Sequence, residues 1–249
     1  MKTLMTIIAN DEIADRVFEM ELEGALTSDM KTPGQFVHVR IDESTEHVLR
    51  RPISIASIDQ EASRFTIIYR ADGAGTSKLA DRRAGENLDI LSPLGNGYPL
   101  ERDRHVLIIG GGIGVPPLYE LSKQLNARGV KTTHVLGFNS QKDVFYEDKF
   151  SALGETFVST ADGSYGTKGF VTDVIEALDG PFDRFYACGP KVMLRALSET
   201  MEIDGYISLE ERMGCGFGVC YACVCETTEG EYVKLCTDGP VFRKGEIVL

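Results

Sequence analysis

The sequence predicts an α+β chain built from several domains: an N-terminal antiparallel β-barrel, a doubly wound α/β domain and a small cysteine-rich C-terminal domain. Three observations support this prediction. Short strands with turn signals fill residues 1–101, strands and helices alternate over 102–205, and four cysteines fall within eleven positions between 215 and 225. With 249 residues, the chain is long enough to bury a core in each of the first two parts.

The N-terminal part shows the period-two pattern of strands that have one buried face. In "QFVHVRI", Val37, Val39 and Ile41 share one face, and "FEMEL", "RFTIIYR" and "ENLDILSP" repeat the pattern. Glycine and proline separate these strands at "TPGQ", "ADGAG" and "SPLGNGYP". A short helix is expected to begin near Thr76. Such a series of short strands is typical of an antiparallel barrel or sandwich.

The middle part changes to alternating strands and helices. "RHVLIIG" is a continuous apolar run, as in a parallel strand that is buried on both faces. "VPPLYELSKQLNARG" carries leucines at helical spacing and stops at Gly129, "KTTHVLGF" and "RFYACG" read as strands, and "PKVMLRALSETM" reads as a helix. This alternation predicts a parallel, doubly wound sheet. In the helix "GFVTDVIEALDG" we expect four side chains to face inward: Phe170, Val174, Ile175 and Leu178.

The cysteine spacing of the C-terminal part is C-x4-C-x2-C, followed after twelve residues by one more cysteine. This is the plant-type spacing for a [2Fe–2S] cluster, in which a tight loop presents three thiolates and a distant segment supplies the fourth. Glycines in the loop let the backbone wrap the cluster and turn N–H groups toward sulfur. The predicted ligands are Cys215, Cys220, Cys223 and Cys236, and the glycines are Gly214, Gly216 and Gly218.

Other interpretations of these cysteines remain open. Structural zinc also takes four cysteines, but usually from two C-x2-4-C knuckles, and this segment has one. Disulfides are disfavoured in a reducing compartment. Cys225 does not fit the cluster pattern, and we expect it to be a small buried residue.

The stretch "IIGGGIGVPP" follows a predicted strand and opens a predicted helix. Gly110, Gly111, Gly112 and Gly114 permit a tight turn and the close approach of a dinucleotide diphosphate to the helix N-terminus. The alternative is an ordinary tight β–α turn. Asp162, in "STADGSYG", is a candidate to bond a ribose 2′-hydroxyl, or else a turn-former before the next glycine. Because no arginine stands there to take a 2′-phosphate, we expect NAD rather than NADP.

The charge balance excludes two classes of partner. The net charge is -12, from 26 basic and 38 acidic residues, and both nucleic acid and anionic membranes require basic patches. The N-terminal apolar run is too short for a signal peptide. No stretch approaches the roughly 18 apolar residues of a membrane-spanning helix. We therefore expect a cytoplasmic protein that binds neither nucleic acid nor membrane.

Four motifs occur in an order and spacing that resemble the ferredoxin–NAD(P) reductase superfamily: "RPIS" (51–54), "GTS" (75–77), "GGGIGVPP" (110–117) and "CGP" (188–190). With "EERMGCGFGVCYACVC" added, the chain resembles one family in it, the iron–sulfur electron-transfer subunits of type B, NAD-dependent dihydroorotate dehydrogenase. The resemblance runs from "TPGQFVHV" to "TDGPVF" near the C-terminus, and the cysteine segment is its most specific part.

The resemblance implies an FAD site in the first part of the chain. Arg51 would meet the flavin diphosphate, Ser54 would lie near flavin N5, and Gly75 and Thr76 would bind phosphate at a helix start. The superfamily often has tyrosine where Ile53 stands. Further residues implied to line the flavin are Pro52, Ile53, Ile68, Tyr69 and Arg70. Cys188 would lie beside the nicotinamide as a small packing residue.

The resemblance also implies a function and a partner. The domains would be an FAD-binding barrel (1–101), an NAD-binding domain (102–205) and a [2Fe–2S] domain (206–249). An FMN-containing partner subunit would oxidise dihydroorotate in pyrimidine synthesis, and electrons would pass through the cluster and FAD to NAD+. We expect a heterotetramer with two copies of each subunit. Two alternatives remain: the electron-transfer subunit of another complex, of the sulfide dehydrogenase or transhydrogenase type, or a non-catalytic zinc-bearing interaction module.

Overall fold

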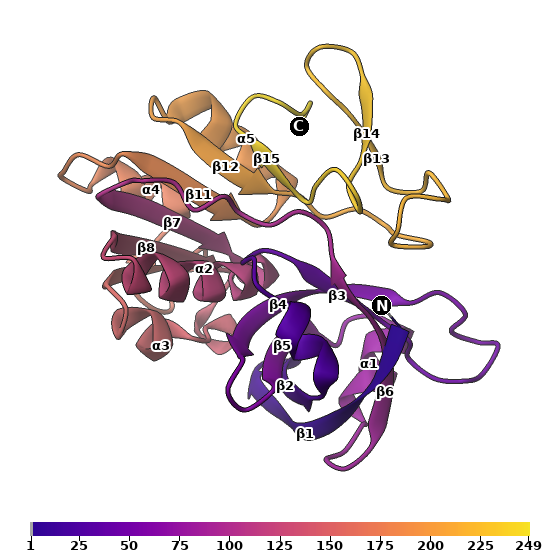
Figure 1. Cartoon of the computed structure of the whole chain (residues 1–249). Coiled ribbons are helices and arrows are strands. Elements are labelled where there is room, and N and C mark those ends of the chain that lie inside the picture. The colour runs from indigo at the N-terminus through magenta and orange to yellow at the C-terminus, as the bar shows by residue number, and fades with distance from the viewer. Residues whose placement is uncertain (1) are drawn as a thin grey trace.

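The computed structural model describes residues 2–249 (Figure 1). The N-terminal strands close into an antiparallel barrel whose interior is filled by the apolar face that the period-two pattern predicts. Helix α1 (Ala74–Ala80) follows β5 and begins before Thr76, because Gly73 and Thr76 together cap its first turn. The barrel strands, in pairing order, are β1 (Lys2–Ala14), β2 (Val17–Glu23), β5 (Arg64–Arg70), β4 (Arg51–Asp59), β3 (Phe36–Val39) and β6 (Asn87–Leu94).

Strand β3 is buried on both faces, which the alternating pattern did not predict. Val37 and Val39 point into the barrel core, as expected. Phe36 and His38 are also buried, because the C-terminal segment covers the outer face of this strand. Strand β3 therefore separates the barrel interior from the cysteine-rich segment.

The middle part forms a doubly wound α/β domain, as predicted. Helices α2 (Pro116–Ala127) and α3 (Glu147–Ser151) pack into one apolar cluster with the sheet, and α4 (Val171–Glu176) and α5 (Lys191–Thr200) pack into another. All strand pairs are parallel except the last. The sheet order within residues 2–249 is β10 (Thr167–Lys168), β9 (Glu155–Thr160), β8 (Lys131–Phe138), β7 (His105–Gly111), β11 (Arg184–Cys188), β12 (Gly205–Ser208) and β15 (Val241–Arg243).

One residue that was predicted to face inward from the helix in "GFVTDVIEALDG" is placed differently. Phe170 is 67% exposed, because α4 begins at Val171 and Phe170 is its N-cap, outside the helical turn. Val171 and Val174 fill the core position instead. The prediction for Val174 is confirmed, and Ile175 and Leu178 are partly buried against the same cluster.

The C-terminal segment is joined to the α/β sheet at its edge. Strand β12 continues the parallel sheet, and β15 returns antiparallel to it, while β13 (Val224–Glu226) and β14 (Tyr232–Lys234) form a separate hairpin. In Figure 1 this segment lies above the barrel and beside β3. The predicted limit after residue 205 lies at the start of β12. No helix within residues 2–249 is long and apolar enough to cross a membrane.

The barrel and the α/β domain share an apolar core. It joins Val17, Ala56 and Ile68 of the barrel to the leucines of α2. Tyr98, in the connecting segment, is fully buried there, and its hydroxyl donates to the carbonyl of Ala187 at 3.0 Å. This shared core fixes the sites of the two domains relative to each other.

Candidate cofactor sites

A cavity of about 730 Å³ lies against β4, β5 and the start of α1. Since β4 and β5 are neighbours in the barrel, the motifs "RPIS" and "IYR" lie side by side on its wall. The structure thus brings together eight of the residues that the resemblance implied for FAD, which are Arg51, Pro52, Ile53, Ser54, Ile68, Tyr69, Arg70 and Thr76.

The Arg51 side chain lies directly over the first turn of α1. A Cβ built on Gly75 would stand 2.8 Å from Nη2 of Arg51, so a larger residue there would displace the guanidinium from this position. The same guanidinium donates through Nη1 to the carbonyl of Leu49 at 2.5 Å. A guanidinium fork beside the N–H groups of a helix start is well suited to a diphosphate. These residues fit the predicted FAD diphosphate site.

Tyr69 borders this cavity, but its phenol points into the barrel core. Its hydroxyl donates to Oδ1 of Asn10 at 2.8 Å, and its ring stacks on Phe18. Burial raises the pKa of Tyr69, so the phenol stays protonated at neutral pH. Ile53 and Ile68 are two of the apolar side chains that line this wall.

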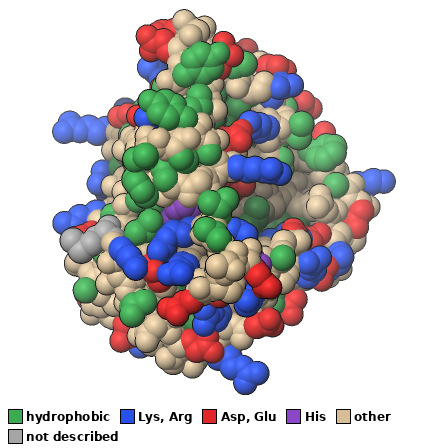
Figure 2. All heavy atoms as spheres, turned by 90° about the vertical axis from the view of Figure 1, so that its right-hand side faces the viewer, with side chains coloured by type: hydrophobic (Ala, Val, Ile, Leu, Met, Phe, Trp, Pro, Cys, Tyr) green, Lys and Arg blue, Asp and Glu red, His purple; other side chains and the backbone are tan. Residues whose placement is uncertain are grey.

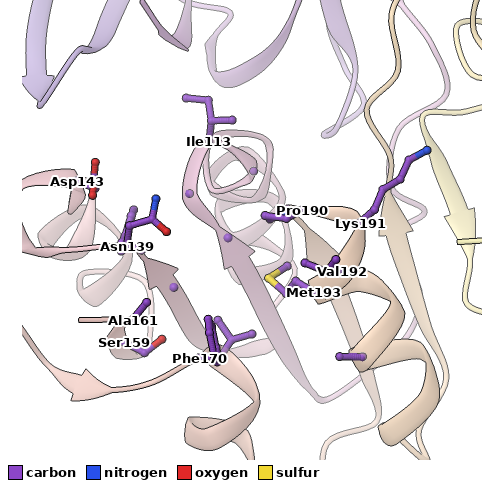
Figure 3. A pocket seen from close by; sticks show the side chains of 18 of the residues that line it. Ile113, Asn139, Asp143, Ser159, Ala161, Phe170, Pro190, Lys191, Val192 and Met193 are labelled. Carbon is purple, nitrogen blue, oxygen red and sulfur yellow. The ribbon is translucent and has the colours of Figure 1, made fainter. Parts of the chain in front are cut away.

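A second cavity, of about 960 Å³, opens at the carboxyl ends of the parallel strands (Figure 3). This is where doubly wound sheets bind nucleotides. Three glycines of the predicted dinucleotide loop line it: Gly111 at the end of β7, and Gly112 and Gly114 in the turn that follows. Gly110 does not line it. A Cβ on Gly110 would stand 2.7 Å from the Val115 side chain, so this glycine serves strand–helix packing.

Gly114 marks the closest approach of the glycine loop to the end of β11. A Cβ there would lie 2.4 Å from the carbonyl oxygen of Cys188. The thiol of Cys188 is buried and is not part of the cavity wall, which is formed at this point by Gly189 and Pro190. Burial raises the pKa of Cys188, so it remains a neutral thiol. Its environment is that of a packing residue.

Asp162 does not line the cavity. Its Oδ1 accepts from the backbone N–H of Ser164 at 2.9 Å and from its hydroxyl at 2.6 Å. The Ser164 hydroxyl and N–H lower the pKa of this carboxylate. In this conformation Asp162 forms an Asx-type turn, which is the alternative that the sequence left open.

Several residues that line this cavity were not predicted from the sequence. Asn139 and Ser159 stand at the ends of β8 and β9, and Figure 3 shows them across the cavity from Met193 of α5. The Ser159 hydroxyl is buried and has no hydrogen-bond partner within residues 2–249, so it is free to bond a ligand. Their position at the carboxyl ends of parallel strands is the signal that would have found them.

The two cavities meet. Arg70, Ile113, Glu210 and Glu211 line both of them. Arg70 is held there by Asp143, whose Oδ1 lies 3.3 Å from Nη1. Groups bound in the two cavities would therefore approach each other at these shared residues.

The cysteine loop presents its first thiol to converging N–H groups. The backbone N–H groups of Phe217 and Val219 donate to Sγ of Cys215 at 3.5 and 3.3 Å, and that of Cys215 donates to Sγ of Cys220 at 3.3 Å. Burial opposes ionisation of the Cys215 thiol, but these N–H groups outweigh it and lower its pKa to about 6. The loop thus stabilises thiolates, the form that binds metal.

The other two predicted ligands form a second pair. Cys223 and Cys236 are both buried, and burial, with their mutual hydrogen bond, raises the pKa of Cys236 to about 12. Within residues 2–249, no group of three or more His, Cys, Asp or Glu side chains is arranged around a single metal position. Two pairs of thiols suit a cluster with two irons, each of which takes two cysteines.

The loop backbone depends on glycine. Gly216 and Gly218 have positive φ angles of 81° and 87°, and a Cβ on Gly214 would lie 3.0 Å from Sγ of Cys220. Nζ of Lys234, in the hairpin, donates to the carbonyl of Gly218 at 2.8 Å. These residues fit the predicted [2Fe–2S] loop.

Cys225, by contrast, lies on β13 opposite Val233, and burial raises its pKa.

Comparisons with known proteins identify two of the domains. The family model "Iron-sulfur cluster binding domain of dihydroorotate dehydrogenase B" matches residues 210–248, and "Oxidoreductase NAD-binding domain" matches residues 108–199. Among solved structures, an NADH-dependent reduced ferredoxin–NADP oxidoreductase, described in a study of flavin-based electron bifurcation, superimposes with a TM-score of 0.90. It is 31% identical, over 99% of this chain and 90% of that one. A ferredoxin–NADP+ reductase from Neisseria gonorrhoeae, 15% identical, shares the fold over 80% of this chain and 90% of its own, with a TM-score of 0.69.

Curated relatives match over nearly the whole length. The dihydroorotate dehydrogenase B (NAD(+)) electron transfer subunit of Lysinibacillus sphaericus (strain C3-41) is 56% identical, over 98% of both chains. The subunit of the same name from Bacillus pumilus (strain SAFR-032) is 55% identical, over 100% of this chain and 98% of its own. Because the match is this close and spans both chains, the protein belongs to the family of dihydroorotate dehydrogenase B (NAD(+)) electron transfer subunits.

Proposed function

We propose that this chain passes electrons from a dihydroorotate-oxidising, FMN-containing partner subunit through a [2Fe–2S] cluster and FAD to NAD+. FAD is suited to the middle position because a flavin exchanges single electrons with iron–sulfur clusters and hydrides with nicotinamide. Dihydroorotate itself would react on the partner, in a complex of two copies of each subunit.

The order of the three sites along the molecule carries this proposal. Met213 and Arg212 line the cavity assigned to FAD, and Met213 stands two positions before Cys215. The same cavity meets the cavity assigned to NAD at Arg70 and Ile113. The cysteine loop, the flavin site and the nicotinamide site therefore follow one another without a gap.

Each part of the chain has a distinct task in this scheme. Arg51 and the start of α1 hold the diphosphate of FAD, and the backbone of the glycine loop after β7 admits that of NAD. Cys215, Cys220, Cys223 and Cys236 hold the cluster. Ser159 and Asn139 hydrogen-bond the dinucleotide from the strand ends. No side chain in this scheme forms a covalent bond with substrate.

The cysteine loop is also where we place the partner. Phe217, Val219 and Tyr221 are 56%, 69% and 68% exposed, although all three are large and apolar. Figure 2, which views this side of the molecule, shows hydrophobic side chains gathered on its upper part. Exposed apolar groups of this kind around a redox site mark a protein interface. With thiols that must stay reduced to bind iron, we place the complex in the cytoplasm.

Visible absorption of the anaerobically purified chain, before and after NADH, tests the proposal. We expect flavin bands that overlap iron–sulfur absorbance, and we expect NADH to bleach both. Iron and flavin analysis of the same sample should give two irons and one FAD per chain. A sample with stoichiometric zinc and no flavin would contradict the proposal and favour a zinc-bearing interaction module.

A further inference from the structure

His38 is a fully buried histidine that the function described above does not use. It lies on β3, and its side chain points away from the barrel core, toward the cysteine loop. Its Nδ1 is 3.2 Å from the carbonyl oxygen of Cys215. A Cβ on the next residue, Gly216, would stand 2.6 Å from the same nitrogen. The His38 ring therefore packs directly against the backbone of the cysteine loop.

The hydrogen bond fixes the tautomer of this ring. A carbonyl oxygen only accepts, so Nδ1 carries the hydrogen and donates it to Cys215. The other nitrogen, Nε2, is buried and has no hydrogen-bond partner within residues 2–249. A buried polar atom left without a partner costs free energy, so within residues 2–249 the bond from Nδ1 to Cys215 is the hydrogen bond that holds this ring.

Strand β3 carries this contact to the flavin site. His38 pairs with Pro52 of β4, and Phe36 pairs with Ser54, so the strand runs beside the motif that lines the flavin cavity. Phe36 itself lines that cavity and packs in the apolar cluster that contains Cys223 and Cys236. One short strand therefore contacts both the cysteine segment and the flavin wall.

Building on the proposed function, we propose that His38 is the positioning residue that fixes the cluster loop against the flavin-binding barrel. Its N–H holds the carbonyl of Cys215, and this orients the peptide units that follow. Those units supply the N–H groups of Phe217 and Val219, which converge on Sγ of Cys215. Hydrogen bonds to the ligand sulfur help to set the potential of an iron–sulfur cluster, so a lost anchor changes its electronic properties.

The test compares His38→Leu with His38→Asn in the full chain with its cofactors bound. Asparagine keeps a side-chain N–H near the place of Nδ1, whereas leucine removes the donor. We expect His38→Leu to lose iron to a chelator roughly 10–100-fold faster. We also expect shifted g-values and a shifted midpoint potential of the reduced cluster in electron paramagnetic resonance, with FAD content unchanged. His38→Asn should restore all three cluster properties.

His105→Leu, in β7 and outside both cavities, is the matched control. Its rate of iron loss, g-values and midpoint potential should be those of the wild type.

A second variant changes the loop side of the contact between His38 and Gly216. Gly216→Ala places a methyl group against the ring on backbone with a φ of 81°, so part of its effect is backbone strain that does not depend on His38. The part that comes from contact with the ring should depend on the presence of His38. In a double-mutant cycle, we expect Gly216→Ala and His38→Leu to be strongly non-additive. Additive effects, or a His38→Leu protein with the wild-type spectrum and chelator-loss rate, would overturn the inference. A wild-type chain without FAD and without a [2Fe–2S] signal would instead contradict the proposed function.

Discussion

At the scale of single residues, burial and hydrogen bonding separate cysteines that look alike in the sequence. Cys215 accepts backbone N–H groups in the loop, whereas Cys236 is buried beside Cys223. Cys188 is buried on β11, whereas Cys225 on β13 is only partly buried and not the buried residue that the sequence predicted. The spacing predicted four ligands and set Cys225 apart, and these assignments stay predictions that substitution can test.

Replacing single cysteines should divide them into two classes. Cys236→Ala removes one of the two thiols in the buried pair, so we expect the [2Fe–2S] absorbance and paramagnetic signal to disappear. Cys225→Ala removes a half-buried strand residue, so both signals should remain. Anaerobic purification and iron analysis of the two variants provide the measurement. A normal spectrum from Cys236→Ala would show that the ligand set is wrong.

The buried side chain of His134 should make the free energy of unfolding depend on pH. It is fully buried, with Nε2 2.8 Å from the Ser122 hydroxyl and Nδ1 2.9 Å from that of Thr156. Burial lowers the pKa of His134 from 6.5 to about 4. The unfolded chain therefore binds more protons between these values, and the free energy of unfolding falls as the pH falls through this window.

From pH 7 to pH 5 this one histidine should remove roughly 2 kcal/mol of stability. Urea unfolding of the holoprotein at the two pH values gives the loss for wild type. His134→Gln cannot titrate, so its stability should fall by about that much less over the same interval. Equal losses in the two proteins would show that His134 does not stay neutral in the fold.

At the scale of secondary-structure elements, the sequence predicted most strands and helices, and the differences have local causes. The first helix begins at Ala74, close to the expected Thr76, and Gly73 and Thr76 form its cap. Phe170 follows the apolar spacing of a helix but lies outside it, as the N-cap. Strand β3 looks half-exposed in the sequence, yet Phe36 and His38 are covered by chain nearly two hundred positions away. Periodicity reports one face of an element and cannot show what covers the other.

Helix α2 joins the two large domains through a buried carboxylate. Oε2 of Glu120 accepts from the backbone N–H of Ile58 on β4 and from Nζ of Lys123, both at 2.9 Å. Glu120→Ala would leave the N–H of Ile58 buried and unpaired, which should lower the free energy of unfolding by roughly 1–3 kcal/mol. Glu120→Gln keeps an acceptor and should cost less. Urea unfolding followed by circular dichroism compares them, and an alanine variant with the wild-type midpoint would refute this role.

At the scale of the whole molecule, three sites come together from parts of the chain that are far apart in sequence. The predicted fold class is confirmed by the barrel, the parallel sheet and the solved relatives. The family resemblance is confirmed by the curated relatives, and with it the electron-transfer function and the cofactors FAD, [2Fe–2S] and NAD. The apolar core that contains Tyr98 fixes the flavin cavity of the barrel relative to the nucleotide cavity of the α/β domain.

Assembly with the catalytic subunit should depend on the exposed side chains of the cysteine loop. Phe217→Ser with Val219→Ser keeps the backbone N–H groups that bond Cys215, so iron content should be unchanged. We expect the Kd for the partner to rise at least roughly tenfold, because a few well-packed side chains, aromatic ones prominent among them, carry most of the binding free energy of a protein interface. Leu4→Ser changes a similarly exposed residue on β1 and is the control. Calorimetric titration measures both, and unchanged affinity would place the partner on another face.

The sequence by itself determined the short antiparallel strands of the N-terminal part, the doubly wound sheet, the glycine loop and the cysteine spacing, because each follows from local periodicity or from residues within one short stretch. Only the tertiary structure decided that the N-terminal strands close into a barrel, that β15 joins the α/β sheet, and that His38 supports the cysteine loop. It also decided that the two cavities meet at Arg70. Such contacts join residues far apart along the chain, and they form only when packing of the apolar cores sets the domains against one another.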